Sequence, residues 1–171
     1  SSRETEMMKW TETYPAQVVM LATQIAWSAA VESALSDSKK GTKPLTPLRG
    51  ELDGQLVSLA KSVLLDLAPH LRKKYEQLIT EVVYQRDVTR DLISSAVMSA
   101  EDFQWLYHLR FYWAPQEQNV FERLCIKMSN ATFFYGFEYL GVGERLVQTP
   151  LTDRCYLTLT QALHFRMGGN P

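Results

Sequence analysis

The best candidate for a ligand site is the loop that reads LVQTPLT, from Leu146 to Thr152. An adenine ring needs flat apolar contacts on its faces and backbone hydrogen bonds at its edge, and a Leu-Val pair followed by Thr-Pro-Leu can offer both. The same pattern is also typical of a loop that enters a helix. The residue types alone leave both interpretations open. The candidate binding residues are Leu146, Val147, Thr149, Pro150, Leu151 and Thr152.

The other residues with catalytic or metal-binding potential are isolated along the chain. His70, His108 and His164 fall on different expected elements and have no ligand partners at a defined spacing. Cys125 and Cys155 form no C-x-x-C pair, and no G-x-S-x-G string occurs. We therefore predict no catalytic site and no metal site, and we expect the cysteines to be reduced, as in the cytosol.

Composition and charge point to a soluble globular protein. The 171 residues are 46% hydrophobic and 22% charged, with a formal net charge of −1. That balance favours neither nucleic acid nor a membrane as a partner, and we interpret the basic runs at Lys39-Lys40 and 72–74 as solvated surface. No apolar run approaches the roughly 20 residues that cross a bilayer, and the segment SSRETEMM is not a secretory signal.

Helical spacing dominates the first part of the chain. We predict a short helix from Glu4 to Glu12 and a long one from Pro15 to about Leu35, followed by an exposed connection from Ser36 to Gly50. One apolar face of the long helix comprises Val18, Leu21, Ala22, Ile25 and Ala29, which Trp27, Ala30, Val31 and Ala34 widen.

Two further helices should pack antiparallel. One runs from Glu51 to Leu67 and the next from Pro69 to about Ser95, because Pro69 interrupts an otherwise continuous stripe. The stripe comprises Leu52, Leu56, Leu59, Val63 and Leu67, and then Leu71, Tyr75, Leu78, Ile79, Val82 and Val83. Asp87 and Arg90 are spaced to pair on the helix surface.

The hydrophobic period then changes from helical to two. Ser99 and Asp102 resemble a capping box that would start a short helix containing Phe103 and Trp105. We expect strands at 109–113, 123–127 and 132–135, with a hairpin turn at Ser129-Asn130. The dense aromatic cluster of Phe103, Trp105, Tyr107, Phe111, Tyr112 and Trp113 is expected to pack in the core.

A last helix follows the candidate loop. Its expected buried face comprises Leu151, Tyr156, Leu159, Ala162, Leu163 and Met167. Thr152 or Asp153 could cap its start, and Gly168 could end it. The fold class is therefore mainly α, a helical bundle-like segment with a small antiparallel β-hairpin near the C-terminal third.

Three strings carry a resemblance to a known family. LVQTPLTDRCYLTLTQAL followed by GGNP resembles the start of the first AAA+ module of dynein heavy chains, most closely the cytoplasmic kind. QRDVTRDLISSAVMSAEDFQWLYHLRFYW with NATFFYGFEYLG is similar to the end of the dynein linker, and YPAQVVMLATQIAWSAAVESAL to an earlier linker helix. The sequence contains no G-x-x-x-x-G-K-[ST] string, so we expect a piece that ends just before the phosphate-binding loop.

The resemblance implies a domain organisation and a role. It implies a helical linker segment at 1–108, a β-hairpin junction at 109–143, and the first loop and helix of the AAA+ module at 144–171. The six loop residues would then line the adenine pocket. The implied role is mechanical: the segment would couple ATP turnover in the ring to movement of the tail, without catalysing hydrolysis itself.

The resemblance also implies the cofactors and partners. ATP or ADP with Mg²⁺ would bind the parent motor, whereas the isolated chain would hold no cofactor. Partners would be the rest of the motor ring and linker, with microtubules and accessory chains reached only through other parts, in the cytoplasm and on the cytoskeleton. The alternative is a free-standing helical scaffold that binds a protein partner and has no nucleotide role.

Overall fold

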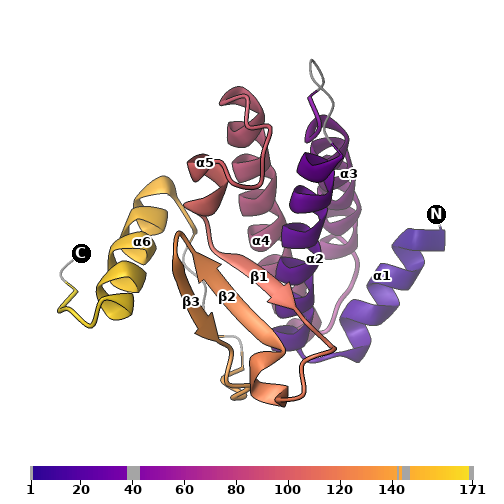
Figure 1. Cartoon of the computed structure of the whole chain (residues 1–171). Coiled ribbons are helices and arrows are strands. Elements are labelled where there is room, and N and C mark those ends of the chain that lie inside the picture. The colour runs from indigo at the N-terminus through magenta and orange to yellow at the C-terminus, as the bar shows by residue number, and fades with distance from the viewer. Residues whose placement is uncertain (1, 38–42, 142, 144–146, 170–171) are drawn as a thin grey trace.

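The computed structural model describes residues 2–37, 43–141, 143 and 147–169. Three long helices form one layer, a small antiparallel sheet packs beside them, and a final helix lies on the other side of the sheet (Figure 1). The described ends of the chain lie on opposite sides of the molecule (Figure 1). The mainly α class expected from the hydrophobic periods is confirmed.

Most of the expected helices are present with nearly the expected bounds. α1 spans Ser2–Thr13, α2 spans Ala16–Ser36 and α4 spans Pro69–Ser94. Proline precedes α2 and opens α4, where its fixed φ suits the first turn and its missing N–H is not needed. Arg90 pairs with Asp87 at 3.3 Å between Nη1 and Oδ1, as the spacing predicted.

The expected bounds of the next helix were wrong at both ends. α3 spans Thr46–Val63, so it begins inside the segment that we expected to be an exposed connection. Pro47 lies in its first turn, and Leu45, just before it, is only 1% exposed. The helix ends before Leu67 because the guanidinium of Arg72 donates to the carbonyl of Val63 at 2.8 Å and satisfies that end of the helix. Residues 38–42 of the expected connection lie outside the described part of the chain.

The hydrophobic core lies between α2, α3 and α4. Leu52 and Leu59 of α3 face Tyr75, Leu78 and Val82 of α4, all of them buried, so the predicted stripes are confirmed. Figure 1 shows α3 and α4 running alongside each other after the turn that joins them.

The expected buried face of α2 was partly wrong. Its buried side chains are Val19, Met20, Trp27, Ser28, Val31 and Leu35, whereas Val18 is 44% exposed. α2 is apolar on nearly all sides, so its sequence alone does not define which side faces the core. The neighbouring elements determine which sides of α2 are buried, because α4 contacts one side and β1 contacts another.

α2 is also long and apolar enough, by composition alone, to cross a membrane. It packs instead against α3, α4 and β1. Its Glu32 accepts hydrogen bonds from the indole of Trp105 and the hydroxyl of Tyr112. These contacts are those of a core helix that joins two layers of a globular fold.

The sheet contains three antiparallel strands in the order β1-β2-β3. β1 spans Arg110–Trp113, β2 spans Leu124–Met128 and β3 spans Ala131–Phe134. β2 and β3 form the expected hairpin across 129–130, with Ser129 at a φ of 52°, in the left-handed region. Leu124 and Met128 point into the core, as the period of two predicted.

The cap of the short helix differs from the expected capping box. α5 spans Phe103–Leu106, and Asp102, not Ser99, precedes it. The carboxylate of Asp102 accepts hydrogen bonds from the amides of Met98 at 3.0 Å and Ser99 at 3.1 Å. The bond from the Ser99 amide is one half of the expected box, whereas the Ser99 hydroxyl accepts from the amide of Glu101 at 3.1 Å.

The final helix, α6, spans Pro150–His164. Its expected buried face was wrong, because only Ala162 of the six residues is buried. The other five, Leu151, Tyr156, Leu159, Leu163 and Met167, are between 40% and 69% exposed. α6 contacts the rest of the chain through its first turn and along β3, which leaves its apolar side uncovered (Figure 1).

Candidate functional site

The predicted binding residues lie where the chain enters α6, a segment we call the 146–152 loop. Val147 is 72% exposed and Leu151 is 69% exposed, so both present apolar surface to solvent. Thr149 precedes α6 and Pro150 is its first residue. Leu146, the remaining expected apolar contact, lies outside the described residues.

The two threonines of the loop cap α6. The Thr149 hydroxyl accepts a hydrogen bond from the amide of Thr152 at 3.3 Å, and the Thr152 hydroxyl accepts from the amide of Thr149 at 3.3 Å. This reciprocal pair is a capping box, and Pro150 suits the first helical position. Of the residues expected as caps, Thr152 takes part in the box, whereas Asp153 does not cap the helix.

A cavity of about 360 Å³ lies between the start of α6, α4 and α5. Thr149 and Pro150 line it, and the described loop residues Val147, Leu151 and Thr152 do not. The walls from the helices include Tyr84, Val88, Leu92, Phe103, Tyr107 and His108. The loop therefore has two sides: one faces the helical layer, and the other carries the exposed Val147 and Leu151.

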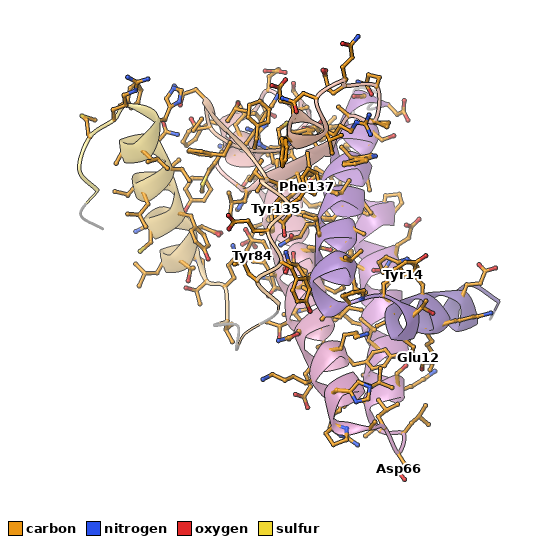
Figure 2. All side chains as sticks on the ribbon, turned by 90° about the horizontal axis from the view of Figure 1, so that it is seen from below. Glu12, Tyr14, Asp66, Tyr84, Tyr135 and Phe137 are labelled. Carbon is orange, nitrogen blue, oxygen red and sulfur yellow. The ribbon has the colours of Figure 1, made fainter. Side chains whose placement is uncertain are left out.

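A cluster of polar side chains at this site surrounds the carboxylate of Asp153, a residue that sequence reasoning considered only as a cap. Asp153 is 4% exposed. Its Oδ1 accepts hydrogen bonds from the hydroxyl of Tyr84 at 3.0 Å and from the amide nitrogen of Gln148 at 3.1 Å. Its Oδ2 lies 3.5 Å from Nδ1 of His108. Figure 2 shows Tyr84 between the long helices and α6.

The pKa values of two tyrosines beside this carboxylate are raised. Burial raises the pKa of Tyr84, and the negative charge and hydrogen bond of Asp153 raise it further. Burial and the charge of Asp153 also raise the pKa of Tyr107, whose hydroxyl donates to the carbonyl of Pro150 at 3.4 Å. Both phenols therefore remain protonated donors at neutral pH.

The three histidines have different surroundings. His70 and His164 are exposed, whereas His108 is 9% exposed and contacts Asp153 and the hydroxyl of Tyr84. Sequence spacing could not reveal this cluster, because its members come from α4, the segment after α5, and α6. Only the polarity of Asp153 in the first turn of an apolar helix was a local signal.

The described residues of this site offer apolar surface for binding. Within the described ranges, no three histidine, cysteine, aspartate or glutamate side chains gather to hold a metal ion. Both cysteines are free. What the loop presents is an apolar rim followed by a capped helix start.

Comparison with known proteins gives the following similarities. Residues 135–171, from the end of β3 to the end of the chain, match the family model described as the hydrolytic ATP binding site of the dynein motor region. The chain is 53% identical over 168 residues to the cytoplasmic dynein heavy chain of Dictyostelium discoideum, which covers 95% of this chain. It is 52% identical over 166 residues, or 96% of this chain, to that of Drosophila melanogaster.

The similarity extends beyond the cytoplasmic kind. The dynein gamma chain of the flagellar outer arm of Chlamydomonas reinhardtii is 40% identical over 159 residues, or 92% of this chain. The chain spans about 4% of the length of each of these three relatives. The comparison therefore concerns one short segment of very long proteins.

Proposed function

We propose that this chain, a segment of dynein heavy chain sequence, is the mechanical joint between the linker and the first AAA+ module of a microtubule motor. Helices α1 to α5 would belong to the linker, the sheet to the junction, and α6 to the module. The linker part would be residues 1–108, the junction 109–143 and the part of the module 144–171. ATP turnover in the ring would move the linker, and this joint would carry that motion toward the tail.

One observation carries this proposal. The family model for the ATP-binding region begins at residue 135, directly after β3, whereas the similarity to dynein heavy chains covers nearly the whole chain. The nucleotide-region match therefore begins inside the chain, directly after the sheet. A chain that contains such a boundary suits a joint better than a self-contained binding domain.

We also propose that the 146–152 loop contacts the adenine of ATP or ADP in the parent motor. Leu146, Val147, Pro150 and Leu151 would supply apolar contact, and Thr149 and Thr152 would fix the loop through their capping box. The exposure of Val147 and Leu151 supports this role, because they are uncovered and do not line the cavity beside α4. The phosphate-binding lysine and the Mg²⁺ ligands would come from other parts of the motor.

The uncovered side of α6 supports the same assignment. Leu159 and Leu163 of α6 are 42% and 65% exposed, and Met167, just after the helix, is 63% exposed. A patch of this kind on a soluble protein usually marks an interface. We propose that the remainder of the AAA+ module covers it, in a cytoplasmic, cytoskeleton-associated motor whose accessory chains bind elsewhere.

The test is the nucleotide affinity of the complete AAA+ module with Leu151→Asp. A carboxylate placed beside the base would be buried without a partner, and we expect affinity to fall by at least about tenfold. Val57→Asp is the control, because Val57 is 56% exposed on α3 and lies far from the loop in the sequence. Circular dichroism would establish that both variants fold. Unchanged affinity in a folded Leu151→Asp module would place the loop away from the nucleotide.

A further inference from the structure

We propose that Asp153 is a positioning residue that fastens the 146–152 loop to α4, so that the loop and the long helices move as one unit. The inference rests on the proposed function, because it names the contact through which the joint would transmit motion. It adds a specific residue to that function, one outside the six that sequence reasoning selected.

A single carboxylate oxygen of Asp153 joins the 146–152 loop to α4. Oδ1 of Asp153 accepts one hydrogen bond from Gln148 in the loop, at 3.1 Å, and another from Tyr84 in α4, at 3.0 Å. The other oxygen faces His108, 3.5 Å away, on the segment between α5 and β1. Three parts of the chain that are distant in sequence therefore meet at one side chain.

The burial of this carboxylate makes its geometry specific. At 4% exposure, Asp153 cannot exchange its protein partners for water without leaving its site, and an unpaired buried carboxylate is strongly unfavourable. Its place in the first turn of α6 adds a favourable interaction with the helix dipole. Rotating α6 away from α4 would break the hydrogen bond from Tyr84 and the contact with His108 together.

Tyr84 connects Asp153 to the aromatic residues of the core. The ring of Tyr84 packs edge-on against Trp27 of α2, with ring centres 6.3 Å apart, and Trp27 packs against Trp105 at 5.3 Å. Tyr107 adds a second tether, from its hydroxyl to the carbonyl of Pro150. Displacement of the loop would therefore act on packed aromatic rings, which resist it more than a solvated loop would.

The first experiment measures amide hydrogen exchange in the 171-residue chain. In Asp153→Ala, the amides of α6 should exchange about tenfold faster, because hydrogen bonds to a charged acceptor are lost locally. In Asp153→Asn they should stay near the wild-type rate, since the amide oxygen still accepts from Tyr84 and Gln148. Tyr84→Phe should resemble the alanine variant, though with a smaller effect.

The control for Tyr84→Phe is Tyr14→Phe, which removes the same hydroxyl from a residue that is 46% exposed. It should leave α6 exchange unchanged. Equal acceleration in α3 and α6 would indicate general loss of stability, and no acceleration in α6 would mean that the loop is held by other contacts. Either result would overturn the proposal.

The second experiment uses a dynein motor domain that carries this segment. Asp153→Ala should lower the ratio of microtubule gliding velocity to ATP turnover by about twofold or more, the lower range for mutations along a coupling path. Asp153→Asn, whose amide oxygen can still accept from Tyr84 and Gln148, should keep the ratio near the wild-type value. An unchanged ratio with faster α6 exchange would overturn the positioning role, whereas the Leu151→Asp measurement separately tests nucleotide contact.

Discussion

Trp105 and Trp113 belong to the same aromatic run but have different surroundings. Trp105 is fully buried, donates to Glu32 at 3.3 Å and packs against Trp27. Trp113 ends β1 and is 48% exposed. The expectation that the whole aromatic cluster packs in the core was therefore wrong for Trp113, and also for Phe103, which is 60% exposed.

We predict unequal effects of removing the two indoles. Trp105→Ala should lower the free energy of unfolding by about 3–5 kcal/mol, because it leaves a cavity in the core. Trp113→Ala should cost about 1 kcal/mol or less, as is usual for exposed positions. Urea denaturation of both variants measures the difference. Equal losses would mean that β1 depends on Trp113 far more than its exposure indicates.

Two half-buried tyrosines should make the fold sensitive to alkali. Burial and Asp153 raise the pKa of Tyr84, and burial and the hydrogen bond to Glu32 raise that of Tyr112, both above the ordinary value of 10.0. The unfolded chain therefore loses these protons at a lower pH than the folded chain. Their contribution to stability is complete below about pH 10 and decreases as the pH rises further.

Urea unfolding between about pH 8 and about pH 11 would test this sensitivity. The midpoint should fall toward the alkaline end, and the fall should be smaller in Tyr84→Phe, which has no phenol proton to lose. Tyr14→Phe should follow the wild type. If Tyr84→Phe also followed the wild type, Tyr84 would ionise equally in both states.

At the scale of elements, the start of α3 shows how a proline-rich stretch can hold a buried anchor. The segment before residue 51 contains Pro44, Pro47 and Gly50, which favoured an exposed connection. The structure begins α3 at Thr46 and buries Leu45 immediately before it. A proline in the first turn of a helix is compatible with helical geometry, so the same residue types serve either outcome.

We predict that Leu45 stabilises the fold as a core residue. Leu45→Ala should lower the free energy of unfolding by about 2–5 kcal/mol. Leu64→Ala is the matched control, because Leu64 follows α3 and is 86% exposed; it should change stability by about 0.5 kcal/mol or less. Thermal unfolding compares the two variants. Similar melting temperatures would show that Leu45 contributes no more than a surface residue.

At the scale of the whole molecule, the chain brings a helical layer, a sheet and a separate helix into one body. α2 contacts α4 on one side and β1 on the other, and α6 approaches the same body from beyond the sheet (Figure 1). Three hydrogen-bonded contacts hold α6 in place. Asp153 accepts from Tyr84 of α4, the carbonyl of Pro150 accepts from Tyr107, and the amide of Gln161 donates to the carbonyl of Met128 at 3.2 Å.

We predict that this 171-residue body binds ATP negligibly. Most of the affinity for a triphosphate comes from phosphate-loop amides, a lysine and Mg²⁺, and the sequence contains no G-x-x-x-x-G-K-[ST] string. Calorimetric titration with Mg-ATP should therefore show no saturable heat up to about millimolar concentration. Micromolar binding would contradict the division of roles between this loop and the rest of the motor.

The sequence by itself determined the local structure of this protein. The stripe in α3 and α4, the period of two in β2 and the turn at Ser129-Asn130 each follow from spacings within a few residues. Such periodicity reports which side of an element is apolar, and backbone geometry turns it directly into a helix or a strand.

Only the tertiary structure decided which apolar sides became core and which polar groups met. α2 is apolar nearly all round, α6 has an apolar side that nothing in the described chain covers, and Leu45 is buried in a stretch with the composition of a loop. The Asp153 cluster draws on α4, α6 and the segment between α5 and β1. Burial depends on which elements, distant in the sequence, pack against a residue. A local pattern contains no information about which elements these are.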